Sequence, residues 1–157
     1  MPTPDHAKNK AKQIKGLELL KTKMPGFYVP TTDEKKKVLQ ILGISKRFIA
    51  TFDAIRLNVE SFSKVENAKD FDLLEIKNSD AYLPNLPHGF FFGLTENEEM
   101  LLKVFEDKYF LCLVCHDPRS LGVSLVGWTE LRDLIQNKRI QYQINLKSKK
   151  ITAVATK

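Results

Sequence analysis

The sequence predicts an α+β fold, in which a central mixed β-sheet is flanked by helices, and three observations support this class. Apolar residues recur with helical spacing near the N-terminus, at Ile14, Leu17 and Leu20. Apolar and polar residues alternate over residues 52–62, which is the period of a half-buried strand. The apolar run Tyr109–Cys115 has the length and composition of a buried strand. Helices and strands are therefore both expected.

Capping and turn residues place the remaining elements. Helices are expected at residues 5–23, at Thr32–Leu42, from the capping box of Thr95 and Glu98 to about Glu106, and at residues 128–136. Thr32 is the expected N-cap of the second helix, and Gly43 follows its end. A further helical turn is expected at residues 45–49. The expected strands are residues 52–62, 71–77, Tyr109–Cys115, Gly122–Val126, 140–146 and 151–154, with a short extended piece at 90–92. The first two strands are expected to pair antiparallel as neighbours.

Length and composition indicate one globular domain over residues 1–157, because 43% of the residues are hydrophobic and 28% are charged. No run approaches the roughly 20 apolar residues that span a bilayer, and the N-terminus lacks an apolar export signal. We therefore expect an intracellular, cytoplasmic protein with no membrane partner. Cys112 and Cys115 are expected to be buried free thiols, since no nearby residues complete a zinc site.

The charge is unevenly distributed along the chain. Residues 1–23 carry six lysines against Asp5 and Glu18, and residues 132–157 carry seven Lys or Arg residues against Asp133. The two ends are thus +4 and +6, and because the whole chain is +6 the middle is −4. An acidic centre between a basic helix at 5–23 and basic strands at 138–157 suits a protein that binds a polyanion. Solvated lysine-rich ends are the alternative.

The residues with most chemical content are Glu75, Ile76 and Lys77, at the end of an apolar strand. Strand alternation places Glu75 and Lys77 on the same face, about 7 Å apart. Asp53 lies at the start of the preceding strand, and a hairpin would bring its carboxylate to Glu75. Two converging carboxylates form an oxygen site suited to Mg²⁺, with Mn²⁺ as a substitute. A surface salt bridge between Glu75 and Lys77 is the simpler alternative.

This pattern resembles the PD-(D/E)xK nuclease superfamily, in which an acid at a strand start is followed, after about one hairpin, by an acid-x-Lys on the next strand. Phe52 stands where that family usually has a proline. The order of helix, strand, hairpin strand, helix and strand is also similar to the restriction-endonuclease-like core and covers about residues 33–116. The resemblance implies a magnesium-dependent DNA endonuclease of restriction or repair type.

The resemblance also implies roles for individual residues. Asp53 and Glu75 would be metal ligands, and Lys77 would activate the attacking water or offset charge on the phosphate. Glu34 and Glu98 are candidates for an additional acid, although a first-turn acid and a capping acid explain them structurally. Asp72 would face the other side of the sheet as a structural residue.

DNA is the expected partner. Lys138, Arg139 and Gln141 would contact its phosphates from the C-terminal strands. A homodimer is expected by analogy, because cutting two strands requires two sites. Two other functions remain open, a nucleic-acid-binding module of the same fold that does not cut, and a protein-interaction domain.

Overall fold

The computed structural model of the chain describes residues 4–148, with side chains from residue 9 onward. Its centre is a five-stranded mixed sheet in the order β1-β2-β3-β4-β5. The strands are β1 (Phe27–Tyr28), β2 (Ala54–Leu57), β3 (Phe71–Ser79), β4 (Tyr109–Cys115) and β5 (Gly122–Val126). Neighbouring strands are antiparallel except β3 and β4, which are parallel. The predicted α+β class with a mixed central sheet is confirmed.

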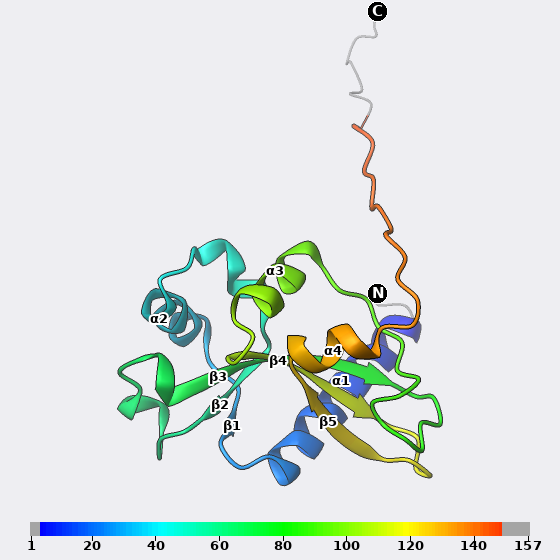
Figure 1. The fold of residues 1–157 in the computed structure, drawn as a ribbon, viewed down its shortest axis with the longest axis horizontal. Coiled ribbons are helices and arrows are strands. Elements are labelled where there is room, and N and C mark those ends of the chain that lie inside the picture. The colour runs from blue at the N-terminus through cyan, green and yellow to red at the C-terminus, as the bar shows by residue number, and fades with distance from the viewer. Residues whose placement is uncertain (1–3, 149–157) are drawn as a thin grey trace, which may run out of the picture.

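Helices cover both faces of this sheet. The α-helices are α1 (Pro4–Lys23), α2 (Thr32–Leu42), α3 (Glu96–Val104) and α4 (Trp128–Leu134), and the 3-10 helices are η1 (Lys46–Thr51), η2 (Phe62–Lys64) and η3 (Ala68–Asp70). Figure 1 shows α2 and α3 on one side of the sheet and α1 on the other. The connection that contains α3 returns the chain to a strand parallel to β3, as such pairs require. Within residues 4–148, no helix is long and apolar enough to cross a membrane.

Because successive residues of β3 point to opposite faces, this strand contributes to two apolar layers. Leu73 packs in the layer on the side of α2 and α3, with Ile55 and Leu111. Leu74 packs in the layer beneath α1, with Leu20 and Cys112. Both faces of β3 are thus covered, so any charged side chain on this strand enters a largely dry environment.

The residues that cap the helices are largely those predicted from the sequence. Thr31, and not Thr32, is the N-cap of α2, since its hydroxyl accepts from the Glu34 amide while the Glu34 carboxylate accepts from the Thr31 amide. Gly43 ends this helix in the left-handed conformation, as predicted. Thr95 and Glu98 form the expected capping box of α3. The turn predicted at residues 45–49 is η1, which Ser45 caps.

The strand predicted over residues 52–62 is much shorter than expected, because β2 ends at Leu57. Polar side chains redirect the backbone beyond that point. The Asn58 side-chain amide donates to the Lys69 carbonyl, and the Asn67 and Asp70 side chains cap η3. Phe62 is buried as the first residue of η2 rather than as part of a strand. The alternation of apolar and polar residues thus extends beyond Leu57, where the paired strand ends.

The prediction of a strand at residues 140–146 is wrong. Residues 135–148 carry no strand or helix, and Lys138, Arg139 and Gln141 lie in this extended segment. The physical reason is the lack of a partner, since no strand in the described part of the chain pairs with this segment. The strand expected at residues 151–154 lies outside the described residues.

The aromatic run and the cysteines behave as ordinary core elements. Residues 90–92 form no strand, but Phe90 and Phe92 pack against the first apolar layer with ring centroids 6.0 Å apart. Cys112 and Cys115 are buried and free, as predicted. Burial raises the pKa of the Cys112 thiol to about 12, which makes it unreactive near neutral pH.

Two glycines with positive φ offer a test of how crowded the backbone is at their turns. Gly26 and Gly43 both have positive φ, at 84° and 70°, but only Gly26 meets backbone, because an added Cβ would lie 2.4 Å from the Leu57 carbonyl oxygen. We expect Gly43→Ala to cost about 1–2 kcal/mol of unfolding free energy and Gly26→Ala clearly more. Urea denaturation of both variants measures this. Equal losses would show that Leu57 can move away.

Candidate active site

Glu75 and Lys77 lie in the middle of the sheet on the face that α2 and α3 cover. They share this face with Leu73, as strand alternation predicted. The Glu75 side chain is 9% exposed and that of Lys77 is 16% exposed, and the Lys77 Nζ lies 3.4 Å from Glu75 Oε2. Glu75 is therefore buried and Lys77 is partly buried, so the pair is not the exposed surface salt bridge considered above.

Asp53 is brought to Glu75 by antiparallel pairing. It immediately precedes β2, whose first residue Ala54 is paired with Leu74. The Asp53 backbone amide donates to the Leu74 carbonyl at 2.9 Å, and the Ile76 amide donates to Asp53 Oδ2 at 2.9 Å. The two acids predicted to converge do so, across adjacent strands.

Glu98 joins this group from α3. Its side chain is 6% exposed, and its Oε1 accepts from Lys77 Nζ at 2.9 Å. The same oxygen accepts from the Thr95 amide at 3.1 Å. One carboxylate thus caps the helix and holds the lysine, so the structural and chemical interpretations of Glu98 apply together.

Glu75 is the least satisfied polar group of this cluster. Among the described side chains, its Oε1 is the one buried polar atom with no hydrogen-bond partner. Burial, a hydrogen bond with Glu98 and the charge of Asp53 raise the pKa of Glu75 to about 10. Burial also acts to raise the pKa of Glu98, but hydrogen bonds from Glu75, Lys77 and the Thr95 amide outweigh it and lower the net value. Without another cation, Glu75 therefore holds a proton and Glu98 carries the charge.

Two further residues border the cluster, and the sequence did not single them out. Tyr109 is fully buried and donates its hydroxyl hydrogen to the Thr51 carbonyl. Burial and the charges of Glu75, Glu98 and Asp53 raise the pKa of Tyr109. It was recognisable only as a core residue, because its nearness to the acids depends on the parallel pairing of β3 and β4.

Lys35 of α2 donates to the Phe52 carbonyl at 3.0 Å, and its Nζ lies 5.3 Å from the centre of the Phe52 ring. The carbonyl that Lys35 binds belongs to the peptide bond between Phe52 and Asp53. The surrounding run of lysines gave no signal that distinguishes this one, since contact with the residue before Asp53 depends on how α2 packs.

Glu34 does not join the cluster through any hydrogen bond or ion pair found between residues 9 and 148. Its carboxylate accepts from the Tyr28 hydroxyl at 2.8 Å and from the Thr31 amide at 2.9 Å. The Thr31 amide is the main cause that lowers the pKa of Glu34. The structure thus places Glu34 as a capping residue.

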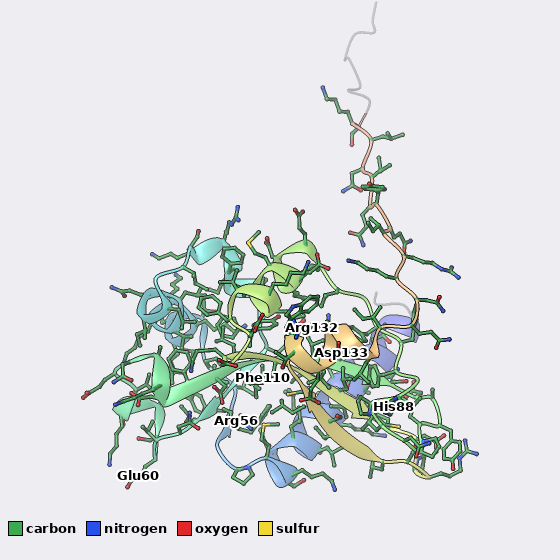
Figure 2. All side chains as sticks on the ribbon, in the orientation of Figure 1. Arg56, Glu60, His88, Phe110, Arg132 and Asp133 are labelled. Atoms are coloured by element: carbon green, nitrogen blue, oxygen red, sulfur yellow. The ribbon has the colours of Figure 1, made fainter. Side chains whose placement is uncertain are left out.

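Asp72 lies on the opposite face of β3, as predicted. It accepts from Arg56 Nη2 at 2.8 Å, and Lys108 Nζ lies 3.5 Å from its other oxygen. Figure 2 shows Arg56 near Phe110, over whose ring its guanidinium lies at 5.8 Å. This second charged group is fully paired and belongs to the framework.

Of the three residues expected to contact DNA, Lys138 lies beside α3. Lys138 Nζ donates to Glu99 Oε2 at 3.2 Å, and Glu99 follows Glu98 directly. Lys138, Arg139 and Gln141 are all exposed. They leave the body of the protein as an extended segment and not as the strand that was expected.

In the described part of the chain, this cluster neither lines a large cavity nor forms a complete set of metal ligands. A hollow of about 640 Å³ lies elsewhere, beneath α1, with Lys12, Lys15 and His116 in its lining. Across residues 4–148, no group of three or more His, Cys, Asp or Glu side chains is arranged to hold a metal ion. The carboxylate pair of Asp53 and Glu75 is the arrangement predicted from sequence, and Mg²⁺ sites in proteins commonly use only one or two carboxylates with waters.

No family model, curated protein or solved structure matches the chain. A function is therefore best sought in the chemistry of the acid–lysine cluster, meaning Asp53, Glu75, Lys77 and Glu98.

The raised pKa of Glu75 predicts how stability depends on pH. Its pKa is about 10 in the folded protein against an ordinary 4.5, so this group favours folding fully below pH 4.5 and progressively less as the pH rises toward 10. We expect Glu75→Gln, which mimics the protonated acid, to stabilise the metal-free protein at pH 8 by on the order of 1–3 kcal/mol and to change little at pH 4.5.

Urea denaturation at both pH values, with EDTA present, measures this effect. Glu60→Gln is the matched control, because the Glu60 side chain is 83% exposed and points outward from the body of the protein, as Figure 2 shows. If Glu75→Gln and Glu60→Gln shift stability equally at both pH values, Glu75 is ionised in the folded state.

Proposed function

We propose that the protein is a metal-dependent DNA endonuclease, with Asp53 and Glu75 as the metal ligands and Lys77 as the cation that acts on the scissile phosphate. The observation that carries the proposal is the convergence of the exposed Asp53 with the buried Glu75 and the partly buried Lys77, where one carboxyl oxygen of Glu75 has no hydrogen-bond partner. A buried carboxyl oxygen without a hydrogen-bond partner is costly, and a bound cation would remove that cost.

The arrangement of strands supports the same proposal. An acid lies at the start of β2, the antiparallel neighbour β3 carries the acid-x-Lys, and a connection through α3 leads to the parallel strand β4. This order is the one that the resemblance to PD-(D/E)xK nucleases implies.

The residues present fit a hard divalent cation, because the Glu75 oxygen without a partner and the Asp53 carboxylate both supply oxygen ligands. Mg²⁺, or Mn²⁺ in its place, would polarise the phosphate and lower the pKa of a bound water. Asp53 is oriented for this role, since the Ile76 amide binds its Oδ2. Glu75 would lose its proton on binding, because the cation supplies the charge that its surroundings lack.

Lys77 is positioned by its two acidic neighbours. An ammonium has three donors; one binds Glu98, and Glu75 Oε2 lies 3.4 Å away as an ion-pair partner. In this proposal a remaining donor contacts a phosphate oxygen of the substrate. Held by Glu98 in this way, Lys77 acts as a cation that stabilises charge on the phosphate rather than as a base.

DNA is the proposed substrate because cationic side chains lie near the acidic cluster. Lys35 of α2 contacts the residue before Asp53, Lys138 pairs with Glu99 of α3, and Arg139 follows Lys138 in the exposed segment. These side chains would hold the phosphate backbone on either side of the cleaved bond.

A second candidate is a nucleic-acid-binding module that does not cut. It is favoured by the absence, within residues 4–148, of a metal-binding group of three or more ligands. In this case Glu75 would stay protonated and Lys77 would serve only to hold Glu98.

Cleavage of supercoiled plasmid tests the choice between the two. With Mg²⁺ or Mn²⁺ we expect nicking that EDTA abolishes, and we expect Asp53→Asn, Glu75→Gln and Lys77→Met each to lower the rate by at least about 100-fold. Loss of the ligands removes the metal, and loss of Lys77 leaves the phosphate charge unbalanced.

The matched controls are Glu60→Gln and Lys64→Met, an acid–lysine pair whose side chains are 83% and 59% exposed. Circular dichroism checks folding, and a thermal shift with Mn²⁺ reports binding without requiring activity. Cleavage that survives in all three site variants would rule out this site. No cleavage and no Mn²⁺ shift in the wild-type protein, with DNA binding retained, would establish the non-cutting module.

The salt dependence of DNA binding tests the basic contacts separately. We expect Arg139→Ala to reduce the slope of log affinity against log salt by about 1 and to weaken binding similarly for all sequences. Lys138→Ala should have a smaller effect, because Lys138 is already paired with Glu99. Fluorescence anisotropy between about 50 and about 200 mM salt measures both. An unchanged slope would remove this segment from the DNA contact.

A further inference from the structure

The segment that follows α4 has the alternating sequence of a strand, but it pairs with no strand in the described part of the chain and is exposed to solvent. Four apolar residues alternate with polar ones over residues 140–146. Their side chains are almost fully in solvent, with exposed fractions of 75% for Ile140, 81% for Tyr142, 77% for Ile144 and 87% for Leu146. This is the pattern of a half-buried strand, so the segment carries an apolar face that nothing in the described chain covers.

The outer edge of β5 is the complementary feature. This strand pairs with β4 on one side, and no strand of the described residues pairs with it on the other. Val123 and Leu125 belong to the layer beneath α1 but are only partly buried. The sheet and this apolar layer therefore both end at an open edge, where a further strand could extend them.

We propose that residues 140–146 add as an edge strand to β5 of a second copy of this chain, and that two copies exchange these segments to form a homodimer. Each copy has one such segment and one open β5 edge, so a twofold axis satisfies both edges and leaves neither segment exposed. This inference does not depend on the proposed nuclease activity.

The direction of the segment favours a second copy over the edge of its own sheet. Figure 1 shows the chain after α4 running away from the body of the protein and away from β5. The Lys138–Glu99 ion pair holds the start of the segment against α3. In that position the apolar residues project beyond the molecule that carries them.

The pairing assigns a side to each residue. The backbone of the segment bonds to the free amides and carbonyls of β5, and its apolar side chains extend the layer that contains Val123 and Leu125. Gln141, Gln143 and Asn145 then lie on the other face, on the side of Ser124, which is paired with Leu113.

Light scattering after size-exclusion chromatography tests the dimer. We expect the wild-type chain to have twice the mass of one copy, and we expect Tyr142→Lys with Ile144→Lys to raise the dimer dissociation constant by at least about tenfold. Gln143→Lys with Asn145→Lys is the matched control, which adds the same charge to the polar face and should remain dimeric. A monomeric wild-type chain, or equal effects of the two double variants, would overturn the proposal.

Cross-linking identifies the edge. Chains carrying only Ser124→Cys are mixed with chains carrying only Gln143→Cys, and oxidation should join the two into a product of twice the mass. The buried native Cys112 and Cys115 are common to every chain and serve as the background. A disulfide that forms only within one chain, when both substitutions are placed in it, would show that the segment pairs with its own β5 and would overturn the exchange.

Discussion

The structure depends on a buried carboxylate, that of Glu75, held at the centre of the sheet between two other acids. Its neighbours partly offset the cost of this burial. Lys77 supplies a positive charge, and Glu75 forms a hydrogen bond with Glu98. The Ile76 amide donates to Asp53 Oδ2 and so stabilises the charge of Asp53. The Oε1 atom of Glu75 remains without a partner. An apolar residue of similar size would avoid this cost, so the acid is not explained by packing alone.

Much of this arrangement was predictable from the sequence, because it rests on local rules. Alternation placed Glu75 and Lys77 on one face, and neighbouring antiparallel strands brought Asp53 to Glu75. Glu98 was recognised as a capping residue, but its contact with Lys77 could not be derived, since it depends on how the β3–β4 connection seats α3 on the sheet. Lys35 and Tyr109 were missed because their nearness to the acids depends on how α2 packs and on the parallel pairing of β3 and β4.

The two strand predictions that did not hold have a common cause. Alternation at residues 52–62 and 140–146 reports that a segment could be half-buried, but a strand also requires a partner for its backbone. In the first case the side chains of Asn58, Asn67 and Asp70 redirect the chain after Leu57. In the second, no described strand lies alongside. Both depend on neighbours that a sequence pattern does not identify.

The double use of Glu98 ties the acid–lysine cluster to a helix end. The same carboxylate oxygen binds the Thr95 amide and the Lys77 ammonium, so replacing it loosens the first turn of α3 together with the lysine. Asp53 caps none of the described helices, so a substitution there changes the cluster and leaves the first turn of α3 in place. Comparing the two substitutions therefore separates the stability of the helix end from the integrity of the cluster.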